Sequence, residues 1–312
     1  MKTSKNDPRF IQYSSLILPL LILILILLAT GCGPPSPDSI TPPVNTILPT
    51  LTPLPPSSTP APTQTLQLIN SGLFYIVVGV FPEGNLPIYQ EPSISAEITG
   101  QIPFSGKSIR TTGNELSADG TTWLQVEYQG SAGWVDFSHL ARQQGDAPEE
   151  LIAQAHTAIA ALKAADYGSL KDIVHTDYCL RFSPYPYLRD SDLSFCHGQL
   201  AQLPGSGTLY TWGHHDGSGD PIQLTFDNYH QRFVYDQDFF QAEVVGLNEA
   251  VSSGNAINNI PEIYPDGMIV EYHFPGIDPQ YAGMDWRSVR MVFIQDKGGW
   301  FLVALVHGEW TI

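Results

Sequence analysis

The chain has 312 residues, and its 31 acidic side chains outnumber its 14 Lys and Arg side chains, which gives a formal charge of −17. A negative field of this size disfavours nucleic acid and anionic lipid as partners, because both carry negative charge. Cationic peptides, sugars and divalent metals fit such a field, and so does a solvated surface that only keeps the protein soluble. The length corresponds to roughly one to three domains.

The N-terminal segment has the organisation of an export signal. Three basic residues precede an apolar run over residues 16–28, and small residues lead from that run to Cys32. The run is shorter than the roughly 20 residues of a membrane-spanning helix and matches the apolar core of a signal peptide. An uncleaved membrane anchor is the alternative interpretation, and in both cases the rest of the chain faces the outside.

The small residues before Cys32 resemble a bacterial lipobox, with Ala29 at the position where that family usually has leucine. The resemblance implies that residues 1–31 are a lipoprotein signal peptide and that Cys32 is lipidated and becomes the first mature residue. The protein is then extracytoplasmic and anchored to the cell membrane through this cysteine. The membrane is thus one expected partner, reached through the lipid.

The lipidated cysteine opens a segment, residues 32–66, in which proline, threonine and serine dominate. Such a composition cannot bury enough apolar surface to offset the entropy lost on ordering, so the segment is predicted to be a disordered stalk. Its prolines favour extended geometry at about 3 Å per residue, and the stalk would hold the folded part up to roughly 100 Å from the membrane.

The first folded domain is expected over residues 67–145, where short apolar runs alternate with turn signals. The predicted strands cover residues 74–80, 86–89, 98–102, 107–111, 122–128 and 133–135. Many short strands at close and even spacing predict a small all-β barrel.

Residues 86–140 resemble a bacterial Src-homology-three domain, through LPIY at 86–89, a WLQVEY strand from Trp123, and GWV at 133–135 with a closing Leu140. The resemblance implies a barrel of five to six strands that binds cell-wall peptides or protein segments and has no catalytic activity. Two positions depart from the family pattern, because Tyr89 replaces the usual arginine and Glu91 the usual glycine.

Small barrels of this type offer a shallow groove lined by aromatic rings, which suits an extended peptide. The candidate lining residues are Tyr89, Trp123, Tyr128 and Trp134. For Trp123 and Trp134 the competing interpretation is that their side chains fill the barrel.

The second folded domain is expected over residues 146–312. Asp146 is positioned to cap a helix whose apolar stripe runs from Leu151 to Leu162, and a second short helix is predicted over residues 169–174. Strands are predicted over residues 221–226, 233–235, 239–245 and 268–274, followed by a hairpin of residues 288–295 and 300–307 around DKGG. The whole chain is therefore predicted to be mainly β or α+β, with N-terminal helices and a curved antiparallel sheet in this second domain.

This order of helices followed by a long sheet resembles the nuclear-transport-factor-2-like cone fold, whose opening helix is similar to LKAADYGSLKDIVH. Strings such as RFSPYPY, HHDGSGDP and FVYDQDF also resemble an uncharacterised family of secreted bacterial proteins. Many members of the cone fold hold a ligand, and some are enzymes.

Two cysteines, Cys179 and Cys196, remain after the lipidated one. An even pair in an oxidising compartment indicates a disulfide, which would contribute about 3 kcal/mol in the chain-entropy model. Two buried free thiols and two thiolate ligands of a metal are the alternatives, although neither a CxxC spacing nor a nearby ligand cluster points to a metal.

The candidates for chemistry are few. Asp216, Ser218 and Asp220 alternate as in an EF-hand calcium loop, but Pro221 stands where that loop needs glycine, and a solvent-facing turn is the competing interpretation. We therefore expect neither a metal nor another cofactor. His273, Asp285 and His307 are the candidate catalytic residues, since they lie near strands that could converge and an Asp/His pair can perform acid–base chemistry.

Two functions follow from these patterns. The first is a surface-tethered binding lipoprotein, in which the barrel engages a cell-wall peptide or an envelope protein and the C-terminal domain holds or senses a ligand. The second is a cell-envelope hydrolase that uses the barrel for targeting. An enzyme would need a histidine and Asp285 within hydrogen-bond reach in one open pocket, whereas a binding protein needs only a concave surface.

Overall fold

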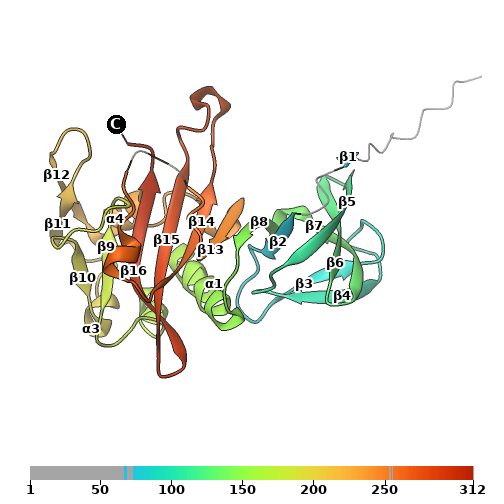
Figure 1. Cartoon of the computed structure of the whole chain (residues 1–312), viewed down its shortest axis with the longest axis horizontal. Helices are drawn as coiled ribbons and strands as arrows, with labels where there is room; N and C mark the ends of the chain where they lie inside the picture. The colour runs from blue at the N-terminus through green and yellow to red at the C-terminus, as the bar shows by residue number, and fades with distance from the viewer. Residues whose placement is uncertain (1–66, 69–72, 253, 255, 312) are drawn as a thin grey trace, which may run out of the picture. The chain divides into compact units, whose positions relative to one another are not determined.

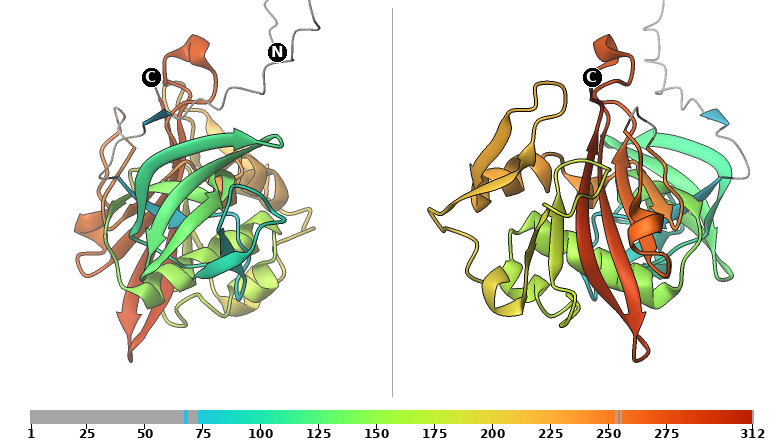
Figure 2. Two further views of the ribbon diagram at one scale, coloured as in Figure 1. Left: turned by 90° about the vertical axis from the view of Figure 1, so that its right-hand side faces the viewer. Right: turned by 60° about the vertical axis from the view of Figure 1, so that its left-hand side comes forward.

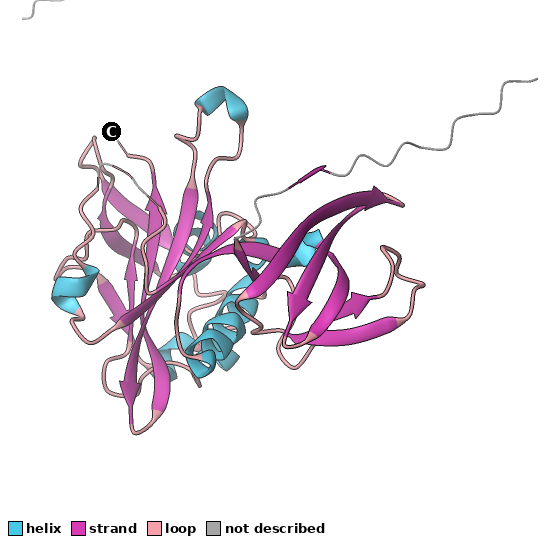
Figure 3. Cartoon of the chain, turned by 45° about the vertical axis from the view of Figure 1, so that its right-hand side comes forward, coloured by secondary structure: helices cyan, strands magenta, loops and turns pink. Residues whose placement is uncertain are grey.

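A computed structural model describes residues 67–68, 73–252, 254 and 256–311 (Figure 1). The predicted signal peptide, Cys32 and the stalk lie outside the described residues. Strands dominate the described part, so the predicted mainly β, α+β class is confirmed (Figure 3). None of the helices within these ranges is both long enough and apolar enough to cross a bilayer.

The β-region, residues 73–145, contains the strands that the alternating pattern predicts. With the short strand that precedes it, the series is β1 (Gln67–Leu68), β2 (Phe74–Val77), β3 (Asn85–Tyr89), β4 (Ile98–Pro103), β5 (Ile109–Ala118), β6 (Thr121–Tyr128), β7 (Ser131–Asp136) and β8 (Leu140–Gly145). The inward-facing positions of β2–β8 form one apolar core that includes Ile88, Ile102 and Val126. Buried and more exposed residues alternate most clearly in β3 and in the first half of β5, as the sequence pattern predicts.

The α+β region, residues 146–311, begins with the predicted helix α1. Its elements are α1 (Glu149–Lys163), α2 (Tyr167–Leu170), β9 (Leu180–Ser183), β10 (Leu193–Phe195), α3 (His197–Leu200), β11 (Leu209–His214), β12 (Pro221–Thr225), α4 (Phe226–Phe233), β13 (Val244–Leu247), α5 (Ile260–Ile263), β14 (Met268–Phe274), β15 (Arg287–Asp296) and β16 (Gly299–Glu309). The predicted hairpin around DKGG is the β15–β16 pair.

Three local predictions in this region are wrong in whole or in part. Of the strand predicted over residues 239–245, the first residues form a short 3-10 helix (Phe239–Gln241), and β13 starts only at Val244. Asp146 does not cap α1, because the helix is preceded directly by Pro148 and Asp146 instead pairs with Lys107, its Oδ1 lying 2.5 Å from the Lys107 Nζ. The strand predicted over residues 233–235 is occupied in part by the end of α4. That helix is capped by Thr225, and its buried residues recur at helical spacing from Phe226 to Phe233.

One mixed sheet runs through both regions in the order β10-β9-β16-β15-β14-β13-β8-β2-β5-β6-β7-β3-β4. Strands β13–β16 are antiparallel neighbours, as expected, but β9 joins β16 in parallel and β13 joins β8 in parallel. Strand β8 therefore links the two regions, with β2 on one side and β13 on the other (Figures 1 and 2). The buried imidazole of His156 in α1 also contacts the Val77 carbonyl of β2, at 2.5 Å from Nε2 to oxygen.

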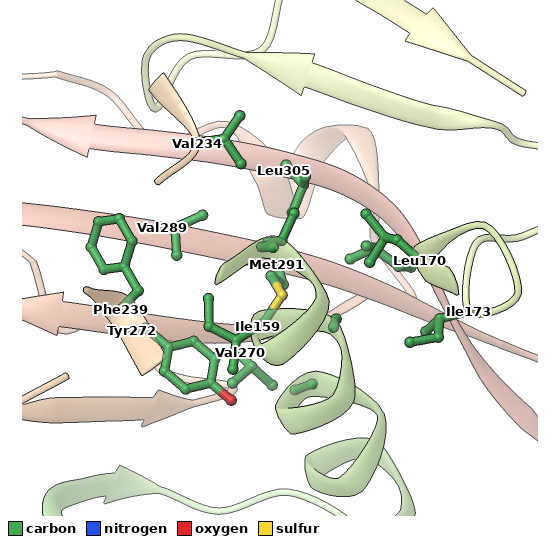
Figure 4. Packing of buried hydrophobic residues seen from close by; sticks show 14 of the residues in the cluster. Ile159, Leu170, Ile173, Val234, Phe239, Val270, Tyr272, Val289, Met291 and Leu305 are labelled. Carbon is green, nitrogen blue, oxygen red and sulfur yellow. The ribbon is translucent and has the colours of Figure 1, made fainter. Parts of the chain in front are cut away.

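The main core lies between α1 and one face of the β13–β16 sheet. In Figure 4, Ile159 of α1 faces Val270, Tyr272 and Met291 of the sheet, all of which belong to the same buried cluster. The cluster also includes Ile76 of the β-region, so the apolar contact extends across the link formed by β8.

The sulfur atoms of Cys179 and Cys196 lie at bonding distance, as the predicted disulfide requires. The bond connects the residue before β9 to the residue before α3. Cys196 also follows the last residue of β10, and Leu180 pairs with Phe195, so the disulfide closes the end of the β9–β10 pair at the edge of the mixed sheet.

Candidate functional site

Three of the four predicted binding residues gather on the outward face of the β-region. Tyr89 in β3 is the cross-strand partner of Trp134 in β7, and Trp134 is in turn the partner of Gln125 in β6. Trp123 lies two residues before Gln125 and therefore shares its face, while Leu124 points into the core. We call the surface formed by Tyr89, Trp123, Gln125 and Trp134 the aromatic face.

The rings of this face have different roles. Trp123 is only 2% exposed, and the ring of Tyr89 meets it edge-to-face with a centroid distance of 5.5 Å. Tyr89 and Trp134 are half-buried, so parts of both rings remain open to solvent. The buried ring of Trp123 thus supports the ring of Tyr89. The competing interpretation, a side chain that fills the barrel, applies to Trp123 but not to Trp134.

Tyr128 does not belong to the aromatic face. It lies two residues after Val126, so its side chain points inward and packs against the core of the β-region. Burial raises the pKa of Tyr128, and Gln129 donates a hydrogen bond to its hydroxyl at 3.2 Å. The ring therefore supports the fold rather than a ligand contact.

A polar group with fixed orientation borders the aromatic face. The side-chain oxygen of Gln125 accepts hydrogen bonds from the Thr112 hydroxyl at 2.9 Å and from the Asn114 amide at 2.7 Å. The amide nitrogen of Gln125 has no hydrogen-bond partner within the described ranges, so it can donate to a carbonyl that approaches Trp134. Aromatic rings beside a free donor suit the backbone of an extended peptide.

The candidate catalytic histidines lie on opposite faces of the sheet. His273 of β14 pairs with Ser288 of β15, whereas His307 of β16 pairs with Val289. Val303 forms a β-bulge in the β15–β16 hairpin. Leu302 pairs with Phe293 and Ala304 pairs with Val292, so Val303 between them has no partner in β15. A one-residue shift moves every later side chain to the other face, so the expected convergence of His273 and His307 does not occur.

Asp285 has a structural contact in the β14–β15 connection. Its Oδ2 accepts backbone hydrogen bonds from Asp278 at 2.7 Å and Ile277 at 3.2 Å. These contacts, the Asp278 amide foremost, hold the pKa of Asp285 below its usual value. Neither His273 nor His307 makes a hydrogen bond or ion pair with Asp285 in the described part of the chain, so the three candidates are not assembled into one site.

An ionic group that the sequence did not reveal surrounds His307 instead. This open cluster comprises Arg232 from α4, Asp236 after it, Arg287 from β15, and His307 and Glu309 from β16. Asp236 Oδ2 lies 3.1 Å from His307 Nε2 and 3.0 Å from Arg287 Nε, and Glu309 Oε1 lies 2.7 Å from Arg232 Nη2. Burial opposes the charged form of Asp236, but the His307 hydrogen bond and the nearby arginines outweigh it and lower the pKa of Asp236.

The open cluster has the residue types of a metal site, since ligand atoms of Asp236, His307 and Glu309 all lie within 4.8 Å of one another. Two guanidinium groups already pair with these carboxylates, however, and a divalent cation would have to displace them. The arrangement is better suited to fixing the segment after α4 onto the end of the sheet.

The opposite face of the sheet carries a second ionic group, the closed cluster of Ser252, Glu271 and Arg290. Arg290 Nε lies 3.1 Å from Glu271 Oε2, the Ser252 hydroxyl contacts both partners, and the Val251 amide donates to Glu271 at 3.0 Å. Glu271 is fully buried. Desolvation disfavours its charged form, but Arg290 and the hydrogen bonds prevail and lower the pKa of Glu271.

Asp216, Ser218 and Asp220 lie in the exposed turn between β11 and β12. The Ser218 hydroxyl accepts from the Asp220 amide at 3.2 Å, and His215 and Asp220 close the turn through their backbones. These contacts describe a hairpin turn, in agreement with the competing interpretation of the sequence.

Comparisons with family models, with curated proteins and with solved structures give no match for this chain.

Proposed function

We propose that the chain is a binding lipoprotein of the cell envelope, anchored to the membrane through lipidated Cys32, and that its β-region is a barrel of the Src-homology-three type that engages an extended peptide. The peptide belongs to the cell wall or to an envelope protein. The α+β region, with the element order of a nuclear-transport-factor-2-like cone, holds or senses a second ligand.

The observation that carries this proposal is the aromatic face. Tyr89 and Trp134 are cross-strand neighbours that stay partly open to solvent, and the buried ring of Trp123 packs against Tyr89. Amphipathic rings of this kind supply large contact area at low entropic cost, which is why they dominate binding surfaces. The free amide of Gln125 adds a donor for a peptide carbonyl.

The hydrolase alternative receives no comparable support. It needs His273 or His307 beside Asp285 in one open pocket, but the two histidines are buried on opposite faces of the sheet. His307 is fully buried, His273 is 6% exposed, and neither contacts Asp285 within the described residues.

The test is binding of the full chain to purified cell wall, measured by sedimentation. Tyr89→Ala should weaken binding roughly tenfold to hundredfold, as expected for a large ring at the centre of an interface. Tyr281→Ala is the matched control, because Tyr281 is a half-exposed tyrosine in the other region. Equal retention of Tyr89→Ala and the wild type, or no retention of the wild type, would overturn the proposal for cell-wall peptides.

A further inference from the structure

The link between the two regions contains a pocket that is separate from the aromatic face. It has a volume of about 330 Å³ and lies beside β8, which pairs with β2 and with β13. Its lining includes the rings of Tyr75 and Phe137, the side chains of Ser138 and Arg142, and the segment that leads into β13. A space of this size holds a small molecule or the end of a peptide.

The walls of this pocket are fixed by the sheet. Tyr75 of β2 and Val244 of β13 are the cross-strand partners of Arg142 on its two sides, so the three side chains stand in one row. Phe137 meets Tyr75 edge-to-face at a centroid distance of 5.9 Å. The pocket is therefore built from both regions. Phe137 supplies its more accessible ring, Tyr75 reaches it only with the 2% of its surface that is exposed, and Arg142 and Glu243 supply one charge of each sign.

Arg142 supplies the positive charge of this pocket. Its side chain is exposed, and its guanidinium makes no hydrogen bond or ion pair with any residue in the described ranges. It is the cross-strand partner of Tyr75. Burial raises the pKa of Tyr75, and the charge of Arg142 opposes that effect. The Tyr75 hydroxyl likewise has no partner in the described part. A guanidinium and a hydroxyl that are both free form a receptor for a carboxylate.

We propose that this pocket binds a carboxylate carried by an apolar, ring-sized group, with the carboxylate on Arg142 and Tyr75 and the apolar group against Phe137. A free aromatic acid and the C-terminus of a peptide that ends in an aromatic residue share this chemistry. The site does not depend on the aromatic face and would take its ligand whether or not Tyr89 binds a peptide.

Calorimetric titration of the full chain tests the proposal with two acids, 3-phenylpropionate and the peptide acetyl-Gly-Gly-Gly-Phe, each compared with its amide. We expect the dissociation constant of the acid to be roughly tenfold or more lower than that of its amide, because only the acid pairs with Arg142. Tighter binding of the peptide identifies a chain terminus as the ligand, and tighter binding of 3-phenylpropionate identifies a free acid.

Two variants sharpen the test. Arg142→Gln should reduce binding of the acid to that of the amide and leave the amide unchanged. Glu243→Gln is the matched control, since Glu243 lines the same pocket with the opposite charge, and it should bind the acid at least as well as the wild type. Tyr89→Ala should not change binding of either acid.

Equal binding of acid and amide to the wild type would overturn the proposal without any variant. So would the absence of binding at millimolar concentrations of both acids, or an Arg142→Gln protein that binds the acid as the wild type does.

Discussion

The two ionic clusters of the α+β region lie on opposite faces of the same strands and differ in what surrounds them. The closed cluster holds Glu271 and Arg290 out of water, with 0% and 3% of their surfaces exposed. The open cluster lies at the end of the sheet, and the side chain of its Arg232 is 44% exposed. Both clusters neutralise largely buried carboxylates with arginines, and they differ in the arginines, since Arg290 is buried whereas the side chains of Arg287 and Arg232 are 25% and 44% exposed.

This difference predicts different energetics. In the closed cluster, removing one partner leaves a buried charge without compensation, and that penalty exceeds the net value of the pair itself. In the open cluster, water and a second arginine can replace a lost partner. The closed cluster should therefore determine stability, while the open cluster should tolerate change.

The largest effect is expected for Arg290→Met. It leaves the fully buried carboxylate of Glu271 without its cation, and the free energy of unfolding should fall by about 3–5 kcal/mol. The double variant Glu271→Met/Arg290→Met removes both charges and should recover part of that loss. Urea denaturation of the three proteins measures this, and a loss below about 1 kcal/mol for Arg290→Met would contradict the assignment.

A smaller effect is expected for Asp236→Asn in the open cluster. The amide keeps the shape of the side chain but removes the charge that His307 and Arg287 face. We expect a loss of about 1–3 kcal/mol, as for a hydrogen bond to a charged group. Urea denaturation at neutral pH gives the value, and Asp190→Asn is the control, because Asp190 is exposed and has no hydrogen bond or ion pair within the described residues. A loss as large as that of Arg290→Met would remove the distinction between the clusters.

Asp236→Asn should also change how strongly acid destabilises the protein. The pKa of Asp236 in the folded state is below its ordinary value of 3.8, so the folded state favours the ionised carboxylate. Its stabilising contribution is present above that value and is lost as pH falls through the lower, folded pKa. Between pH 6 and pH 3 the wild type should therefore lose more stability than Asp236→Asn. Equal losses in the two proteins would contradict this.

Local patterns explain which parts of this fold the sequence could predict. The strands of the β-region were found because alternation and turn residues are encoded within a few positions. Helix α4 was missed because its aromatic residues continue directly into FVYDQDF, which has the composition of a strand. The helical spacing of Phe226, Tyr229 and Phe233 was the signal that could have identified it.

The ionic clusters could not be predicted from local sequence patterns. Asp236 and His307 are separated by 71 positions and meet only after β16 has paired with β15. The face on which His307 lies depends on the irregularity at Val303, and without it His307 would pair with Ser288, the partner of His273. The expectation that His273 and His307 converge was therefore wrong because of one extra residue in β16, which no local sequence pattern marks.

The smallest effect is expected for Arg232→Met, which removes the exposed cation of the open cluster. In the wild type the guanidinium carbon of Arg232 lies 4.4 Å from the centroid of the Phe233 ring, and the methionine keeps an apolar side chain over that ring. Glu309 retains a second cation, since Arg287 Nη2 lies 3.5 Å from its Oε2. We expect a loss of no more than about 1 kcal/mol, and the loss should shrink further at high salt because exposed charges are screened. Urea denaturation at low and high salt measures both, with Arg290→Met as the buried counterpart whose loss should depend little on salt. If Arg232→Met cost as much as Arg290→Met at both salt concentrations, exposure would not distinguish the two clusters, and the open cluster would have to be treated as part of the folded core.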